Sequence, residues 1–89
     1  METTKKFKLA LIDMLELGEF DRIIKNAKGA SRRAAEKDKK FIKCLYDAFG
    51  RDIDKYSFAY INYEIKSKDI YANALCYMSR YDRDGKTDD

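Results

Sequence analysis

The sequence predicts an all-α fold, a compact bundle of about five short-to-medium helices around a long central helix. Apolar residues recur at intervals of three and four along most of the chain, glycines follow these apolar runs, and no proline interrupts them. A chain of 89 residues, 45% hydrophobic and 39% charged, is expected to form one domain that spans residues 1–89.

The first two helices are expected at residues 4–17 and 19–28. Phe7, Leu11 and Met14 form the main apolar stripe of the first helix. The second helix has apolar residues at positions i, i+3, i+4 and i+7, and its first turn contains acidic residues that interact favourably with the helix dipole. Because it has only about ten residues, it is expected to depend on packing against the other helices.

The longest predicted helix, residues 31–49, is amphipathic and organises the rest of the chain. Ser31 is expected to cap its first turn, and Gly50 is expected to end it. The face of this helix that points away from the core is expected to be strongly basic. The face expected to pack in the core comprises Ala34, Ala35, Phe41, Ile42, Leu45 and Phe49.

A fourth helix is predicted after Gly50, with Asp52 or Asp54 as its cap and Lys66 near its end. The aromatic and β-branched residues of this segment also favour a strand. A lone strand could not satisfy its backbone hydrogen bonds, and no second strand is predicted to pair with it, so we favour the helix.

The last helix is expected to follow Ser67 or Asp69 as its cap and to reach Arg83. The polar tail, residues 84–89, is expected to fray. The apolar stripe of this helix comprises Ile70, Ala74, Tyr77, Met78 and Tyr81.

The residue types give little support to catalysis, and we expect no enzyme activity, no cofactor and no metal site. The chain has no histidine, and Cys44 and Cys76 have no basic partner that would activate a thiol. Both cysteines lie among apolar residues and are expected to be buried, with a single disulfide as the less favoured alternative. No segment resembles a membrane span or a secretory signal, which favours a cytoplasmic protein without a membrane partner.

The charge is distributed unevenly along the chain. Residues 9–21 contain four acidic and no basic residues, whereas residues 22–43 contain nine basic and two acidic residues, a net charge of +7. Such a segment can contact nucleic-acid phosphates or an acidic protein surface, although a solvated helix face that maintains solubility has about equal weight. The candidate contact residues are Lys25, Lys28, Arg32, Arg33, Lys37, Lys39, Lys40 and Lys43.

Tyrosine is the second unusual feature, because six of the seven tyrosines lie between Tyr56 and Tyr81. An exposed tyrosine can anchor a protein partner or stack on a nucleotide base, although packing in the core is the favoured alternative. The apolar surface exceeds what a monomer of this length is expected to hide, so a partner or a homodimer is expected to cover part of it. The candidate anchors are Tyr56, Tyr60, Tyr63 and Tyr71.

These observations predict a small non-enzymatic binding protein of regulatory or inhibitory type. It would dock its basic helix face and its tyrosines onto a larger protein or nucleoprotein. The alternative is a module that binds nucleic acid directly through the basic segment 22–43, and a weaker third hypothesis is a protein that sequesters a small anionic ligand. The many lysines and tyrosines, with no histidine, proline or tryptophan, are typical of phage or mobile-element proteins from AT-rich genomes, for which an anti-defence role is expected.

Overall fold

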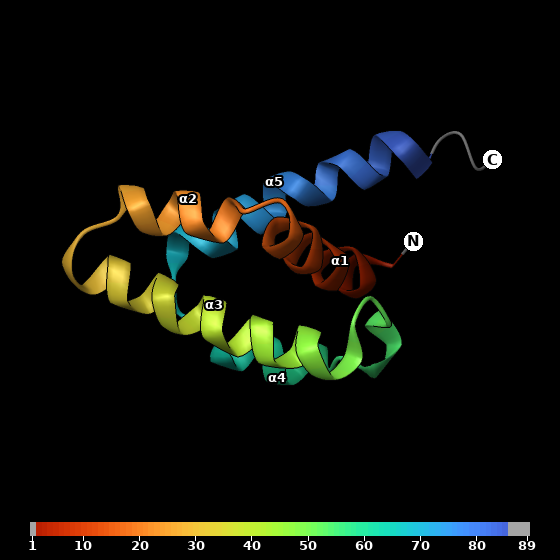
Figure 1. The fold of residues 1–89 in the computed structure, drawn as a ribbon. Coiled ribbons are helices and arrows are strands. Elements are labelled where there is room, and N and C mark those ends of the chain that lie inside the picture. The colour runs from red at the N-terminus through yellow and green to blue at the C-terminus, as the bar shows by residue number, and fades with distance from the viewer. Residues whose placement is uncertain (1, 86–89) are drawn as a thin grey trace.

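A computed structural model describes the backbone of residues 2–85 and the side chains of residues 2–81. In this part of the chain the fold is all-α and has no strand, which confirms the predicted fold class. The elements are α1 (Thr3–Glu16), α2 (Glu19–Asn26), α3 (Gly29–Phe49), the 3-10 helix η1 (Ile53–Lys55), α4 (Phe58–Glu64) and α5 (Lys68–Gly85). Figure 1 shows α2 and α3 running antiparallel, with α4 alongside α3.

The most deeply buried helix is α1, which contacts α2, α3, α5 and η1. Four of its side chains, Ala10, Leu11, Ile12 and Met14, are at most 1% exposed. The longer α3 covers the core with one face only, because its other face is charged. The bundle therefore has α3 as its longest helix and α1 at the centre of its core.

Two glycines set the ends of helices. Gly18 has a φ of 78° between α1 and α2, and Gly50 has a φ of 59° directly after α3. Both values lie in the left-handed region, which is strained for residues that carry a Cβ. The predicted ends of α1 and α3 are therefore close to those observed, whereas α2 ends at Asn26, two residues earlier than predicted.

The prediction that Ser31 caps α3 is wrong. The helix begins two residues earlier, at Gly29, and Ser31 lies exposed in its first turn. Lys28 is extended, and its carbonyl accepts a hydrogen bond from the Arg32 amide at 3.4 Å. Because the helical hydrogen bonds already start at Lys28, Ser31 lies inside the helix, where it cannot act as the cap.

The prediction of one continuous helix from Asp52 or Asp54 to Lys66 is also wrong. The backbone is extended at Tyr56 and Ser57, with ψ values of 133° and 114°, which interrupts the helix. At this break the buried amino group of Lys8 donates to the Tyr56 carbonyl at 3.0 Å. The Tyr60 amide instead donates to the Ser57 hydroxyl at 3.2 Å, which caps a new helix. The segment is therefore divided into η1 and the seven-residue α4.

Asp38 of α3 fixes the connection between α4 and α5. Its side chain is 1% exposed, and its carboxylate accepts hydrogen bonds from the amides of Lys66, at 3.1 and 3.0 Å, and Ser67, at 2.7 Å. The Ser67 hydroxyl in turn accepts a hydrogen bond from the Ile70 amide at 3.1 Å. Ser67 is therefore the one of the two predicted residues that caps the last helix. The helix continues through Gly85, and residues 86–89 of the predicted frayed tail lie outside the described residues.

Candidate functional site

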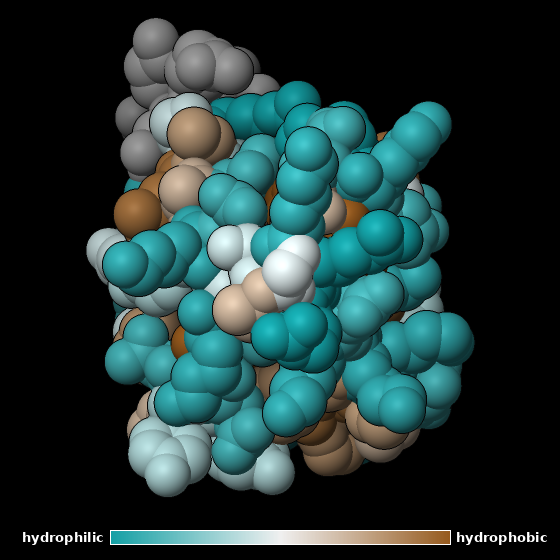
Figure 2. Space-filling view, turned by 90° about the vertical axis from the view of Figure 1, so that its left-hand side faces the viewer, coloured by the Kyte–Doolittle hydropathy of each residue, from teal (hydrophilic) through white to brown (hydrophobic). Residues whose placement is uncertain are grey.

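The basic residues predicted as contacts come from the end of α2, the following turn and α3. Lys25 lies in the last turn of α2, Lys28 directly precedes α3, and the other six lie on α3. All of these residues are exposed except Lys39, which is half-buried. Figure 2 views the molecule from the side of the α2–α3 turn and shows that this face is mainly hydrophilic.

Three of the eight basic residues are engaged in ion pairs within the chain. Lys39 pairs with Asp21 of α2. Arg32 and Lys43 each pair with the carboxylate one turn further along α3, at 3.7 and 3.2 Å. These three cations are partly neutralised and are weaker candidates for contact with an anionic partner.

The remaining five basic residues make no ion pair with the described part of the chain, and we call them the cationic face: Lys25, Lys28, Arg33, Lys37 and Lys40. Arg33, Lys37 and Lys40 follow the spacing i, i+4, i+7, which places them on one side of α3. Like charges at i, i+4 destabilise a helix by about 0.2–0.5 kcal/mol per pair. Arg33 and Lys37 are such a pair, so the helix keeps one unfavourable arrangement on this side.

The acidic segment 9–21 does not neutralise the cationic face, because its carboxylates are paired elsewhere. Asp13 and Glu16 of α1 both bind Arg51, at 3.1 and 2.5 Å. The two acidic residues of α2 pair with Arg22 and with Lys39. The negative segment thus acts within the bundle, while the positive segment keeps exposed charges.

Tyr56 is not an exposed anchor, contrary to its selection as a candidate. Its side chain is 3% exposed, and its hydroxyl donates to the Gly50 carbonyl at 2.5 Å. The ring packs against Phe49, with 5.6 Å between the ring centroids. Tyr56 therefore belongs to the core and helps to fix the turn after α3.

The other three candidate anchors are exposed and lie on two different helices. Tyr60 and Tyr63 of α4 are 53% and 70% exposed, and Tyr71 of α5 is 39% exposed. The amino group of Lys66 lies 4.7 Å from the centroid of the Tyr63 ring. Lys66 lies outside the basic segment 22–43, so the charge pattern along the sequence does not single it out.

Tyr71 contributes to a separate exposed apolar region on α5. It packs against Phe7 of α1, with 5.3 Å between the ring centroids, and Leu75 one turn further on is 49% exposed. Tyr71 and Leu75 lie in the stretch from residue 70 to residue 79, which carries no charged side chain. Whether a second copy of the chain covers this region stays a prediction.

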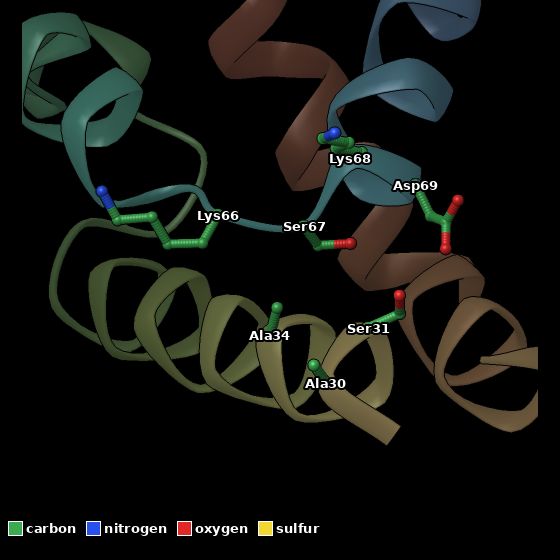
Figure 3. Close-up of a pocket in the computed structure, with 7 residues that line it drawn as sticks. All are labelled: Ala30, Ser31, Ala34, Lys66, Ser67, Lys68 and Asp69. Carbon is green, nitrogen blue, oxygen red and sulfur yellow. The ribbon is translucent and has the colours of Figure 1, made fainter. Parts of the chain in front are cut away.

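A pocket of about 430 Å³ lies between the start of α3 and the connection that leads into α5. It is lined by Ala30, Ser31, Ala34, Lys66, Ser67, Lys68 and Asp69. Figure 3 shows Ala30 and Ala34 on its α3 side, while the Lys66 side chain extends away toward α4. The side chains that line the pocket do not converge on a common point, so it offers no arrangement of reactive groups.

The prediction that both cysteines are buried is wrong. Cys44 and Cys76 are free and exposed. Cys44 follows Lys37 by seven residues, two helical turns, and therefore lies on the same outward side of α3. Among the described residues, no group of three Cys, Asp or Glu side chains is arranged to hold a metal ion.

Both thiols are expected to react in the folded protein, because neither is enclosed by the core. A disulfide reagent such as dithionitrobenzoate, added without denaturant, should modify both cysteines at rates close to that of an unstructured thiol. Cys44→Ser and Cys76→Ser should each leave one reactive thiol. Slow modification that accelerates in denaturant would contradict the exposed positions.

None of the helices in the described part of the chain is long and apolar enough to cross a membrane. The sequence matches no known protein-family model. Comparisons with curated proteins and with solved structures also find no significant match.

Proposed function

We propose that this chain is a non-enzymatic binding protein of regulatory or inhibitory type. It docks its cationic face onto an anionic surface of a larger protein or nucleoprotein. The observation that carries the proposal is the lack of internal ion pairs: the five residues of the cationic face stay exposed and form no ion pair within the described chain.

The contrast within α3 supports this function over simple solvation. Arg32 and Lys43 have carboxylates one turn away and form ion pairs, so the helix uses this stabilising spacing where no contact is proposed. Lys37 has no carboxylate three or four residues away, and Glu36, four residues before Lys40, pairs with Arg32 instead. An anionic surface would replace the repulsion between these cations with attraction and would accelerate association through electrostatic steering.

A matched pair of charge-reversal variants tests the function. Lys37→Glu with Lys40→Glu, and Lys55→Glu with Arg80→Glu, both change the formal net charge from +3 to −1. All four residues are exposed. Only the first pair alters the cationic face, so it is expected to weaken partner binding about 10–100-fold, whereas the second pair should retain it.

The measurement is affinity capture from a cognate host lysate with immobilised wild-type protein and the two variants. Proteins retained by the wild type and by Lys55→Glu with Arg80→Glu, and lost with Lys37→Glu and Lys40→Glu, are identified by mass spectrometry. Retention of no specific protein by the wild type, or equal retention by both variants, contradicts the proposed function.

A further inference from the structure

Two exposed aromatic rings lie on consecutive turns of α4. Tyr60 and Tyr63 are three residues apart, which corresponds to a rise of about 4.5 Å along a helix and to neighbouring positions on its surface. Their side chains are 53% and 70% exposed, whereas Ile61 between them is fully buried. The rings therefore form a short aromatic row on the outer side of this helix.

A ring contact joins this aromatic row to α3. The Tyr60 ring meets Phe41 of α3 edge-on, with 5.2 Å between centroids and 85° between ring planes. Phe41 lies one helical turn after Lys37, so Lys37 of the cationic face is on the same side of α3 as the place where Tyr60 packs. Figure 1 shows α4 lying alongside α3, in agreement with this contact.

A cation also lies at the other end of the aromatic row. The amino group of Lys66 is 4.7 Å from the centroid of the Tyr63 ring. Exposed cations therefore lie toward both ends of the aromatic row, with Lys37 one turn from the residue that Tyr60 contacts and Lys66 over the Tyr63 ring. An anionic protein surface could contact both the cations and the tyrosines, but a single-stranded nucleic acid carries a phosphate and a stackable base in every repeating unit.

Single-stranded nucleic acid is the polyanion whose chemistry matches both parts of this surface. Its phosphates bind lysine and arginine, and its unpaired bases stack on aromatic rings without regard to sequence. The bases of a duplex are stacked on one another, so they cannot lie on the tyrosines. The α3 stripe is rich in lysine rather than in the arginine, asparagine and glutamine that read base edges, which favours binding without sequence preference.

We infer that the cationic face and the aromatic row together form a binding surface for single-stranded DNA or RNA. Phosphates contact Arg33, Lys37, Lys40 and Lys66, and bases stack on Tyr60 and Tyr63. This inference rests on the proposed function, since the same lysines supply the charge. It specifies the anionic part of the nucleoprotein as an exposed single strand.

The test is fluorescence anisotropy with a labelled 12-nucleotide oligothymidylate, its oligouridylate counterpart and a duplex of the same length, at about 50 mM salt. The single strands are expected to bind more tightly than the duplex, and a comparison of the two strands shows whether DNA or RNA is preferred. The logarithm of the binding constant should fall with the logarithm of the salt concentration with a slope of about −2 to −3.5, for three to five phosphate contacts.

Tyrosine variants separate stacking from charge. Tyr60→Ala with Tyr63→Ala is expected to weaken single-strand binding at least tenfold without changing the salt slope, because the phosphate contacts remain. Tyr60→Phe with Tyr63→Phe should restore binding, since the rings are kept. Tyr71→Ala is the matched control at an exposed tyrosine outside this surface, and it should bind as the wild type does. Circular dichroism verifies that each variant is folded.

Each alternative result has a distinct meaning. Equal affinity for single strand and duplex, or full binding by the alanine pair, overturns the single-strand surface and leaves a general phosphate-binding face. No binding to any of the three nucleic acids also overturns it, while capture of a protein partner that depends on Lys37 and Lys40 would keep the proposed function. Nucleic-acid binding that survives Lys37→Glu with Lys40→Glu overturns the single-strand surface, because its phosphate contacts would then be elsewhere.

Discussion

Asp38→Ala is expected to lower the free energy of unfolding by about 2–4 kcal/mol. The carboxylate is buried and receives the amides of Lys66 and Ser67, so its removal leaves two backbone donors without an acceptor. Ser67 is itself 4% exposed, which prevents water from replacing the lost acceptor at that amide. Chemical denaturation followed by circular dichroism measures the change.

Asp47→Ala provides the matched control on the same helix. Its carboxylate pairs with Lys43 at the surface, where the side chain is 63% exposed, so its loss should cost less than about 1 kcal/mol. If the two variants had equal stability, the hydrogen bonds to the connection before α5 would contribute nothing beyond a surface ion pair. That result would remove Asp38 as the group that holds this connection.

The same carboxylate should give an unusual dependence of stability on pH. Burial raises the pKa of Asp38 above its ordinary value of 3.8 and outweighs the amide hydrogen bonds, which lower the pKa. The folded protein therefore binds this proton more tightly than the unfolded chain does, and the contribution of Asp38 to stability falls as pH rises through this range. Relative to Asp38→Asn, the wild type is expected to gain stability as the pH is lowered toward 3.8, measured by chemical denaturation.

The core of the bundle is the part that the sequence predicts best. Leu11 and Met14 of α1, and Ile70 and Ala74 of α5, lie on the predicted apolar stripes and are at most 1% exposed. Helical periodicity is a local property that is fully written in the sequence, and burial of the apolar side follows from it. The all-α fold class follows for the same reason.

The break before α4 could not be predicted in this way, because its cause is not local. The amino group of Lys8 binds the carbonyl of Tyr56, 48 residues away, at the point where the backbone is extended. The pairing of Lys39 with Asp21 likewise joins two helices and reduces the predicted basic surface. The i, i+4 ion pair of Arg32, by contrast, is a regular helical spacing that the sequence already contains.

The prediction that both cysteines are buried is wrong because it depends on their neighbours in the chain and not on helix geometry. Their apolar neighbours in the chain favour burial, but the direction of a side chain from a helix depends on its angular position. Cys44 shares the outward side of α3 with Lys37, and Cys76 lies one turn after the exposed Ala72 on α5. The angular position alone would have placed both thiols at the surface.

Above about pH 10, the fold is expected to lose stability steeply, because four tyrosines hold their protons more tightly in the folded state. Burial is the main cause of the raised pKa of Tyr56, Tyr77 and Tyr81, and the hydrogen bond to Glu16 is the main cause for Tyr46. The unfolded chain ionises first, so the free energy of unfolding falls as pH rises past the ordinary value of 10.0. The midpoint of thermal unfolding should decrease by about 10 °C or more, measured by circular dichroism.

Tyr81→Phe isolates one contribution to this alkaline instability. The Tyr81 hydroxyl donates to the Asp13 carboxylate, which also binds Arg51, so the variant should lose about 1 kcal/mol at neutral pH. It has no proton to lose at this position, so the fall of its unfolding midpoint above about pH 10 should be smaller than in the wild type. If the unfolding midpoints of the two proteins fell in parallel with rising pH, the Tyr81 hydroxyl would ionise as readily in the folded state as in the unfolded chain. That result would contradict its buried hydrogen bond to Asp13.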